Sequence, residues 1–385
     1  MKIGILTLAL ETNYGGILQA FALQKVLRDM GHEVYTIDRH NRRAYKSLKA
    51  NILGYAKRNI QRYLQHKNVP VCWNPFVTEE VYRVITSNTR DFVARNMNMT
   101  RECWSDELAE IDKEYKFDAY VVGSDQVWLP KYYPSSFLSF VNRPNVIKVI
   151  YAASCGRKSF LDVDGAKENV AEYAKDFSGI SVREDSLVHQ TAKYLGITPV
   201  HVLDPTLLLT PNDYLNASLD NVGTAPVVFS YILDMNEEKT KLGKAISKKI
   251  SLPLVEGNTT CPYVKSKGAD VTKCIFPPVD NWIRNLQRAE FVVTDSFHGT
   301  VFAILFNKQF ITIGNKDRGI DRFMSLLRQC NLENRIVTNF SPTELQNVMN
   351  EKIDYSKVNY EIEALRDLSF EFLQKSLRNE LKQVD

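Results

Sequence analysis

The stretch Phe291-Val292-Val293-Thr294-Asp295-Ser296-Phe297-His298-Gly299 decides the fold that we predict for this chain of 385 residues. Its first three residues are apolar, as in a strand buried on both faces. The run 300–306 is compatible with a helix, and residues 310–313 are typical of the next strand. The stretch is therefore predicted to be a tight strand-to-helix turn in a βαβ unit. Such turns lie at the carboxyl ends of parallel strands, where ligands of open α/β sheets bind.

The residues of this turn are suited to chemistry on an anion. Asp295 or Ser296 can cap the helix, and Gly299 allows a close approach of the backbone. The first-turn N–H groups of the helix would form an anion site, and His298 beside it could move a proton. A capped turn with an incidental histidine is the alternative, and the stretch by itself does not separate the two.

Length and composition predict a globular protein of two domains. A chain of this length is too long for one ordinary core, and 44% hydrophobic and 24% charged residues are ordinary values. We expect an N-terminal α/β domain at 1–209, with a basic helical insertion at about 39–78. A C-terminal α/β domain at 210–385 follows, and its terminal helix could cross back. The net charge of +4 is too small to indicate nucleic acid as a partner.

The cysteines and apolar runs favour a cytoplasmic protein. None of the six cysteines forms a CxxC pair, and no histidine lies at metal-ligand spacing from one, so we expect no metal. The apolar segment Ile3–Leu10 is short for a signal peptide and lacks a small-residue cleavage site, so we interpret it as the first strand. No run approaches the ~20 apolar residues that span a bilayer.

The N-terminal segment predicts another βαβ opening. A strand at 2–10 and a helix at 18–30 flank a turn that contains Asn13, Tyr14, Gly15 and Gly16. The turn is not GxGxxG, so it gives no support for dinucleotide binding. A phosphate- or carboxylate-sized site made by the helix N-terminus and the glycine backbone is one interpretation. A plain turn with two glycines is the other.

A basic stretch without acidic residues extends from Arg39 to Thr78. Apolar residues within it follow helical spacing. A basic amphipathic helix can lie on an anionic membrane surface, so peripheral membrane contact through Arg39–Lys67 is one hypothesis. Packing of the apolar stripe on its own domain and a mobile insertion are the alternatives. The stripe consists of Tyr45, Leu48, Ile52, Tyr55, Asn59 and Tyr63, and the basic residues are Arg39, Arg42, Arg43, Lys46, Lys49, Lys57, Arg58, Arg62 and Lys67.

Two further predicted strands end in polar residues. The strand at 119–122 leads into Gly123-Ser124-Asp125-Gln126-Val127-Trp128. Asp125 could accept a proton from a hydroxyl there, and Trp128 could stack on a sugar, or the two could be a turn cap and a core residue. Arg183 follows the strand at 180–182, where a fixed guanidinium suits a carboxylate or phosphate. Its alternative role is a salt bridge to Glu184 or Asp185.

These motifs occur in an order that resembles the polysaccharide pyruvyl transferase family. Each motif alone is weak, but six in order across Met1–Val337 are specific. They are Asn13-Tyr14-Gly15-Gly16 with Leu18-Gln19-Ala20 and Gln24, Gly123 to Trp128, Ile180-Ser181-Val182-Arg183-Glu184 with Ser186, Leu203-Asp204-Pro205-Thr206, Ser296 to Gly299, and the Arg322 region with Leu326-Leu327.

The resemblance implies two Rossmann-like domains with parallel sheets, a GT-B-like fold, and an active site in the interdomain cleft. The donor would be phosphoenolpyruvate, and the product a pyruvate ketal on a sugar of a bacterial capsule, exopolysaccharide or cell-wall polymer. No metal or organic cofactor is expected. The acceptor could be carried on a polyprenyl diphosphate, which would bring a cytoplasmic enzyme to the inner membrane face.

The resemblance also implies roles for individual residues. Donor binding falls on Arg183 and on the segment Ser296-Phe297-His298. From the chemistry of phosphoenolpyruvate we expect His298 to be the acid, Arg183 to hold a carboxylate or phosphate, and Asp125 to be the base. Family members often have a basic residue shortly before the histidine, where this chain has Ser296 or Phe297, so Arg322 or Arg318 would supply that contact. The expected donor site comprises Asn13, Tyr14, Gly15, Gly16, Arg183, Ser296, Phe297, His298, Gly299 and Arg322, and the acceptor site Ser124, Asp125, Gln126 and Trp128.

Two other functions remain open. A GT-B nucleotide-sugar glycosyltransferase would need a carboxylate for the nucleotide ribose in the second domain, where Glu256 is the nearest residue of that kind. A non-catalytic glycan-binding member of the family would bind the acceptor without turnover.

Overall fold

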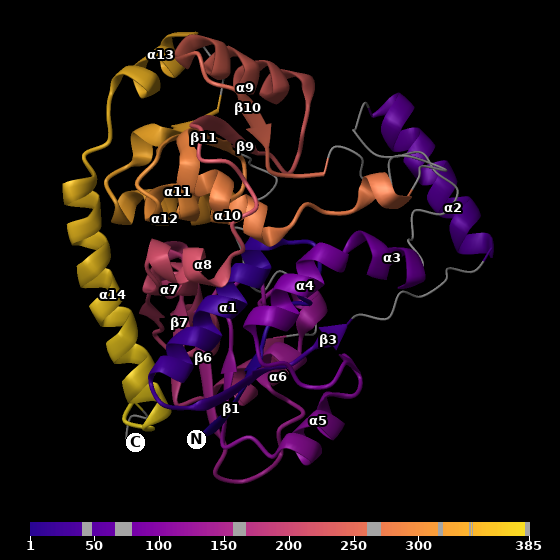
Figure 1. The fold of residues 1–385 in the computed structure, drawn as a ribbon. Coiled ribbons are helices and arrows are strands. Elements are labelled where there is room, and N and C mark those ends of the chain that lie inside the picture. The colour runs from indigo at the N-terminus through magenta and orange to yellow at the C-terminus, as the bar shows by residue number, and fades with distance from the viewer. Residues whose placement is uncertain are drawn as a thin grey trace.

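Two parallel β-sheets, each covered by helices, form the core of the protein (Figure 1). The computed structural model describes residues 1–40, 48–65, 79–156, 167–259, 271–314, 319–338, 340 and 342–381. The first sheet has the strand order β2-β1-β5-β6-β7-β8, and the second has β10-β9-β11-β12-β13. The predicted α/β class with two parallel sheets is confirmed.

The strands of the first sheet are β1 (Lys2–Leu6), β2 (Glu33–Thr36), β5 (Ala119–Val122), β6 (Ile147–Ala153), β7 (Gly179–Val182) and β8 (Val200–His201). Those of the second are β9 (Val227–Tyr231), β10 (Leu254–Glu256), β11 (Ala289–Thr294), β12 (Gln309–Ile313) and β13 (Ile336–Val337). A short parallel pair, β3 (Arg39–His40) and β4 (Cys103–Trp104), lies outside both sheets.

The α-helices are α1 (Tyr14–Asp29), α2 (Leu48–Asn59), α3 (Glu79–Ile85), α4 (Ser87–Asn96), α5 (Leu108–Tyr115), α6 (Lys167–Ala174), α7 (Asp185–Leu195), α8 (Pro211–Ala217), α9 (Glu237–Ile250), α10 (Val279–Arg288), α11 (Phe297–Leu305), α12 (Ile320–Gln329), α13 (Pro342–Asn350) and α14 (Tyr355–Leu377). Shorter turns of helix are η1 (Ile60–Leu64), η2 (Pro130–Tyr132), η3 (Ser135–Phe137), η4 (Pro205–Leu208), η5 (Val271–Cys274) and η7 (Glu333–Arg335).

The stretch at 291–313 forms the predicted βαβ unit at the centre of the second sheet. β11 pairs in parallel with β9 on one side and with β12 on the other. From Phe291 on, β11 is fully buried, as its apolar sequence predicts for a strand with helices on both faces. The turn to α11 therefore lies at the carboxyl edge of the sheet.

The N-terminal helix begins four residues earlier than the sequence predicts. α1 begins at Tyr14, so Gly15 and Gly16 lie in its first turn and not in the loop before it. The predicted glycine turn between strand and helix is thus wrong in position. Two adjacent glycines usually mark a turn. Here Gly15 is needed inside the helix, because a Cβ at this position would collide with the side chain of His298 from the other domain.

The C-terminal helix α14 lies along both domains, at the left of Figure 1. At its start, the Tyr355 hydroxyl donates to the Lys308 carbonyl of the second domain. Near its end, it packs against β6 and β7 of the first domain, and a Cβ on Gly179 would lie 2.1 Å from Ser376 Oγ. α14 therefore connects the second domain back to the first sheet. None of the helices in the described ranges is both long and apolar enough to cross a membrane.

Candidate active site

The β11–α11 turn is built by its own polar side chains. Ser296 is the N-cap of α11, and its Oγ accepts a hydrogen bond from Gly299 N at 3.3 Å. The hydroxyl of Thr294 accepts from Ser296 N at 3.0 Å. A Cβ on Gly299 would lie 2.2 Å from that hydroxyl, so the turn requires glycine there. The predicted cap and close approach are confirmed.

Asp295 has a structural role beside this turn. Its fully buried carboxylate accepts from Lys239 Nζ at 2.7 Å and from the backbone N–H groups of Leu233 and Asp234 at 2.6 and 3.1 Å. Both turns at the carboxyl edge, after β9 and after β11, are thereby fixed to each other. Capping of α11 is left to Ser296.

His298 lies in the first turn of α11 and is held between two segments of the first domain. Its Nε2 is 3.6 Å from Asp204 Oδ2. On the opposite edge, a Cβ on Gly15 would lie 2.2 Å from the Nδ1 and Cγ atoms of the imidazole. Only glycine at this position lets α1 pack on the ring, so His298 is 5% exposed and faces the first domain.

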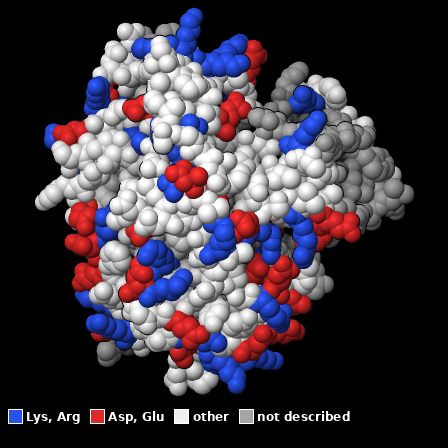
Figure 2. Space-filling view, in the orientation of Figure 1, with Lys and Arg blue, Asp and Glu red and all other residues white. Residues whose placement is uncertain are grey.

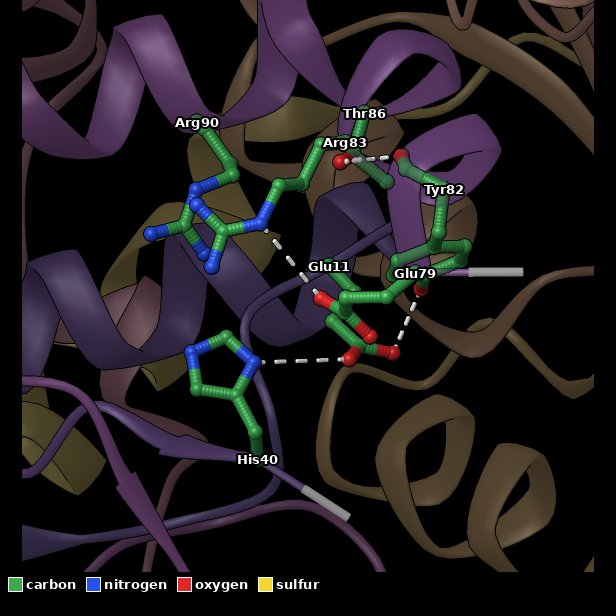
Figure 3. Close-up of a pocket in the computed structure, with 7 residues that line it drawn as sticks. All are labelled: Glu11, His40, Glu79, Tyr82, Arg83, Thr86 and Arg90. Carbon is green, nitrogen blue, oxygen red and sulfur yellow. Dashed lines mark hydrogen bonds and ion pairs between the residues drawn. The ribbon is translucent and has the colours of Figure 1, made fainter. Parts of the chain in front are cut away.

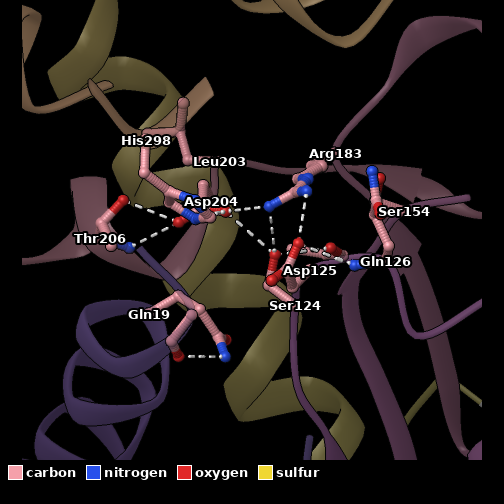
Figure 4. A network of polar contacts seen from close by, with 12 residues as sticks. Gln19, Ser124, Asp125, Gln126, Ser154, Arg183, Leu203, Asp204, Thr206 and His298 are labelled. Atoms are coloured by element: carbon pink, nitrogen blue, oxygen red, sulfur yellow. Dashed lines mark hydrogen bonds and ion pairs between the residues drawn. The ribbon is translucent and has the colours of Figure 1, made fainter. Parts of the chain in front are cut away.

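Arg183 lies at the centre of a buried polar network (Figure 4). Its Nη1 donates to Asp204 Oδ2 at 2.7 Å and to Ser124 Oγ at 3.2 Å, and its Nη2 donates to Asp125 Oδ1 at 3.4 Å. Burial opposes the charge of the guanidinium, but the carboxylates of Asp204, Asp125 and Glu184 outweigh it and raise the pKa of Arg183. The alternative that the sequence left open, a salt bridge from Arg183 to Glu184, is present at 3.8 Å. The ion pair of Arg183 with Asp204 is shorter, at 2.7 Å.

Asp204, to which the sequence analysis gave no role, joins Arg183 to His298. Its Oδ1 accepts from the backbone N–H and hydroxyl of Thr206 at 3.1 and 2.7 Å, and its Oδ2 accepts from Ser124 Oγ at 3.0 Å. Burial alone would raise the pKa of Asp204, but His298 and Arg183 hold it well below its usual range. The available signal was an aspartate directly after a predicted strand, within the motif Leu203 to Thr206.

Phe297, where the chain departs from the family pattern, lies between two guanidinium groups. The centre of its ring is 4.4 Å from Cζ of Arg183 and 5.7 Å from Cζ of Arg322 of α12. Both arginines are buried, so the aromatic face stabilises them where water does not. The structure thus brings the predicted donor cation Arg322 to the same aromatic ring as Arg183. Arg318 lies outside the described residues.

Asn13 and Asp125 approach each other at the carboxyl edge of the first sheet. Nδ2 of Asn13 donates to Asp125 Oδ2 at 3.3 Å, and Asn13 is exposed while Asp125 is 5% exposed. Asp125 has a φ of 75°, in the left-handed region that non-glycine residues seldom adopt. Gln126 is half-buried beside it and donates its backbone N–H to Asp125 Oδ1 at 2.9 Å. Backbone strain of this kind is often found at functional sites.

Three side chains that the sequence assigned to ligand contact are buried in the core. Tyr14 is fully buried, donates to the Pro277 carbonyl at 2.7 Å and packs on the rings of Tyr231 and Trp282, so only its backbone is left for a donor. Trp128 is also fully buried and stacks on Phe137, so it cannot stack on a sugar.

Ser124 is the third. It is fully buried, and its hydroxyl donates to the Ala152 carbonyl at 2.9 Å and to Asp204, which excludes direct contact with an acceptor. Tyr14 is thus covered by the second domain, Trp128 by Phe137 of η3, and Ser124 by Ala152 of β6 and by Asp204.

One group of possible metal ligands lies elsewhere in the described part of the chain. Donor atoms of Asp38, His40 and Glu102 lie within 4.8 Å of one another. Arg90 Nη2 is 2.7 Å from Glu102 and 3.6 Å from Asp38, so a cation of the protein itself already balances these carboxylates. The group does not include a residue of the network around Arg183.

The fold and this two-domain site define a GT-B-like α/β protein. A UDP-GlcNAc 2-epimerase from Neisseria meningitidis bound to UDP-GlcNAc is similar, with a TM-score of 0.53 and 10% identity over 97% of this chain and 100% of that one. The S. aureus MnaA–UDP structure has a TM-score of 0.51 and 13% identity over 100% and 98% of the two chains. At such identities the likeness concerns the fold, and it confirms the predicted GT-B-like class.

The sequence model of the polysaccharide pyruvyl transferase family matches residues 13–318. The chain belongs to this family, as the ordered motifs predicted. No curated protein sequence matches the chain significantly.

Proposed function

We propose that the protein transfers the enolpyruvyl group of phosphoenolpyruvate to two hydroxyls of a glycan sugar, forming a pyruvate ketal and releasing phosphate. The observation that carries the proposal is the position of His298, which lies against Asp204, the carboxylate that also binds Arg183. Phosphoenolpyruvate must be bound as an anion and protonated at C3. A histidine that can carry a proton, fixed near an arginine that can bind the anion, suits both needs.

The reaction balances with two sugar hydroxyls and one donor. One hydroxyl oxygen bonds to C2 of phosphoenolpyruvate while C3 accepts a proton, and the C2=C3 double bond is lost. The second hydroxyl oxygen then bonds to C2 as the C2–O bond to phosphate breaks. Of the two hydroxyl protons, one replaces the proton given to C3 and the other leaves with phosphate.

His298 is the proposed acid for C3. Its Nε2 faces Asp204, whose carboxylate compensates the charge of a protonated ring. Asp204 is a positioning residue in this proposal, because it also binds Arg183 and so fixes the distance between the proton carrier and the cation.

The donor anion would bind to buried cations and to the start of α11. Arg183 and Arg322 flank Phe297, which is the first residue of that helix. Arg183 Nε has no hydrogen-bond partner among the described residues, so it is available to a carboxylate or phosphate oxygen. The backbone at Ser296, Phe297 and Gly299 and the first turn of α1 at Asn13–Gly16 complete the proposed donor site, with no metal or organic cofactor.

The acceptor sugar would bind at the first-domain edge. Asp125 is the proposed base for the attacking hydroxyl, with Asn13 and Gln126 beside it. We place the reaction in the synthesis of a bacterial capsule, exopolysaccharide or cell-wall polymer. An acceptor on a polyprenyl diphosphate would locate it at the cytoplasmic face of the inner membrane.

One experiment tests the function and identifies the acceptor. The protein is incubated with phosphoenolpyruvate and synthetic or lipid-linked galactosides, mannosides and N-acetylhexosamines, and products are analysed by mass spectrometry. A mass gain for a pyruvate ketal, with phosphate release that depends on the glycan, is expected. His298→Ala and Arg183→Ala should abolish both, and wild-type turnover in both variants would refute the site.

A nucleotide-sugar glycosyltransferase is the alternative, because solved proteins with this fold bind UDP or UDP-GlcNAc. Glu256 is exposed at the end of β10, where it could meet a ribose. A melting temperature raised by UDP- or GDP-sugars but not by phosphoenolpyruvate would favour it. Acceptor binding without any turnover would instead indicate a non-catalytic member of the family.

A further inference from the structure

The segment α2–η1, residues 48–65, exposes large apolar side chains. Leu53, Tyr63 and Leu64 are 70%, 67% and 75% exposed. Ile52 and Ile60 are each 48% exposed, and Tyr55 is 37% exposed. A single exposed leucine is ordinary, but six such residues on one short segment make the kind of exposed apolar surface that marks an interaction site. The predicted packing of this stripe on its own domain is therefore wrong at Tyr63, whereas Ile52 and Tyr55 are partly covered.

The stretch 39–78, which includes this segment, concentrates positive charge in the sequence. Nine basic residues and no acidic residue lie between 39 and 78, which leaves 40 basic and 45 acidic residues elsewhere, a net charge of −5. Within α2–η1, Lys57 and Arg62 are exposed. Figure 2 shows blue side chains on the described part of the protrusion at the upper right, whereas red and blue alternate over the body.

We propose that α2–η1 is a membrane-contact surface that binds the anionic headgroups of a lipid bilayer. Exposed aliphatic and tyrosine side chains suit the boundary between headgroups and acyl chains, and lysine and arginine suit the negative surface. This inference does not depend on the reaction proposed above.

One predicted member of the basic set does not reach this surface. Arg39 is 4% exposed and donates through Nη2 to the Thr7 carbonyl at 2.9 Å. Its charge is therefore bound inside the first domain. Arg42, Arg43, Lys46 and Lys67 lie outside the described residues, and so do the whole of Tyr45 and the side chains of Leu48 and Lys49.

The described segments on either side of α2–η1, which end at His40 and begin at α3, meet at Glu11 in the loop before α1 (Figure 3). His40 Nδ1 lies 3.8 Å from Glu11 Oε1, and Tyr82 Oη donates to Glu11 Oε2 at 2.5 Å. Thr89 Oγ1 donates to the Glu11 carbonyl at 2.6 Å. Because Asn13 is two residues further on, these contacts connect the segments next to α2–η1 with the loop that carries Asn13 of the proposed site.

Vesicle sedimentation tests the surface on the full chain. The wild type should sediment with vesicles of phosphatidylcholine and phosphatidylglycerol, more weakly with phosphatidylcholine alone, and less at high salt. Lys57→Gln with Arg62→Gln should weaken binding to anionic vesicles roughly 30-fold, at about 1 kcal/mol for each basic residue. The double variant Leu53→Ser with Leu64→Ser should also weaken binding to vesicles. This loss should be the same at low and at high salt, because it removes apolar contacts and not charges.

The matched control is Lys244→Gln with Lys248→Gln, which removes two exposed charges from α9 and should leave vesicle binding unchanged. All three variants alter exposed side chains and should unfold at the wild-type temperature. Binding of the first variant within threefold of the wild type would overturn the proposal, and so would equal loss in the control. The proposal would also be overturned if the wild type were a dimer in solution and the double variant Leu53→Ser with Leu64→Ser were a monomer. The apolar face would then be a contact between two copies of the chain.

Discussion

Oδ2 of Asp204 lies 3.6 Å from Nε2 of His298, and the two residues belong to different domains. Asp204 also binds Arg183 at 2.7 Å, so a single carboxylate fixes the proposed acid relative to the proposed anion-binding cation. The site therefore exists only when the second domain is seated on the first.

Asp204→Asn should lower turnover with phosphoenolpyruvate and glycan roughly 100-fold, because a small displacement of His298 or Arg183 misplaces the reacting groups. Removing one partner of a buried ion pair should also cost about 3 kcal/mol of unfolding free energy. Phosphate release and urea unfolding measure the two effects. Asp213→Asn, which changes the half-buried capping-box residue of α8, away from the site, is the control and should leave turnover intact.

The same carboxylate predicts a dependence of stability on acid. The pKa of Asp204 is lowered in the folded protein. Its ionised carboxylate therefore contributes to the free energy of unfolding at pH values above the unfolded pKa of ~3.9, and this contribution is lost as the pH falls further. The difference in unfolding free energy between wild type and Asp204→Asn should thus shrink below about pH 4. Urea unfolding at pH 7, 5 and 3 measures it, and a constant difference would contradict the assignment.

Gly15→Ala should separate the two domains at the site. The new Cβ would lie 2.2 Å from the His298 ring, and such overpacking costs about 1–3 kcal/mol and shifts the backbone. We expect turnover to fall at least 100-fold, with a lower melting temperature. Gly243→Ala in α9 places its Cβ 3.5 Å from Leu254, an ordinary contact, and should leave both quantities unchanged or slightly improved.

Phe297→Leu should weaken binding of the donor more than it slows the chemistry. Loss of the aromatic face removes cation–π contacts with Arg183 and Arg322, and each such buried contact contributes about 1–2 kcal/mol. The KM for phosphoenolpyruvate should rise about tenfold or more, with kcat within about threefold of the wild type. A change in kcat with constant KM would indicate that the ring acts on His298 instead.

His40→Gln should lower the stability of the protein in a pH-dependent way, because it removes the interactions of the imidazole with Glu11 and Asp38. Hydrogen bonds to Asp38 and Glu11 raise the pKa of His40 to about 9, above the unfolded value of 6.5. The stabilisation is therefore complete below pH ~6.5 and is lost as the pH rises through 9. Urea unfolding should show a deficit of about 1–2 kcal/mol for the variant at pH 6 that closes by pH 10. An equal deficit at both values would exclude titration of His40 as the cause.

The predictable part of the fold is the part set by local pattern. The apolar strand before Thr294, the serine cap and the glycine at 299 follow from residues within a few positions of each other. Strand ends with polar residues likewise marked Asp125 and Arg183, because parallel sheets collect such residues at one edge.

The less predictable part depends on contacts between distant segments. A glycine pair at 15–16 suggests a turn, and only the packing of His298 from the other domain explains a glycine inside a helix. Tyr14 and Trp128 are aromatic residues near a strand end. The sequence does not show whether such a side chain packs in the core, as both do, or contacts a ligand. Asp204 was visible in a motif, but its role needed the distance to His298.

The chain passes between the domains twice, once before β9 and again through α14, which is fixed to the first sheet by Ser369 Oγ accepting from Leu203 N at 3.0 Å. A body attached at one point can rotate about any axis, but a body attached at two points can rotate freely only about the line that joins them. If the second domain opens to admit a glycan, α14 restricts it to a single arc, along which His298 leaves and returns to Asp204. Cutting the chain before Tyr355 would remove this second covalent connection, and the second domain could then turn in other directions as well.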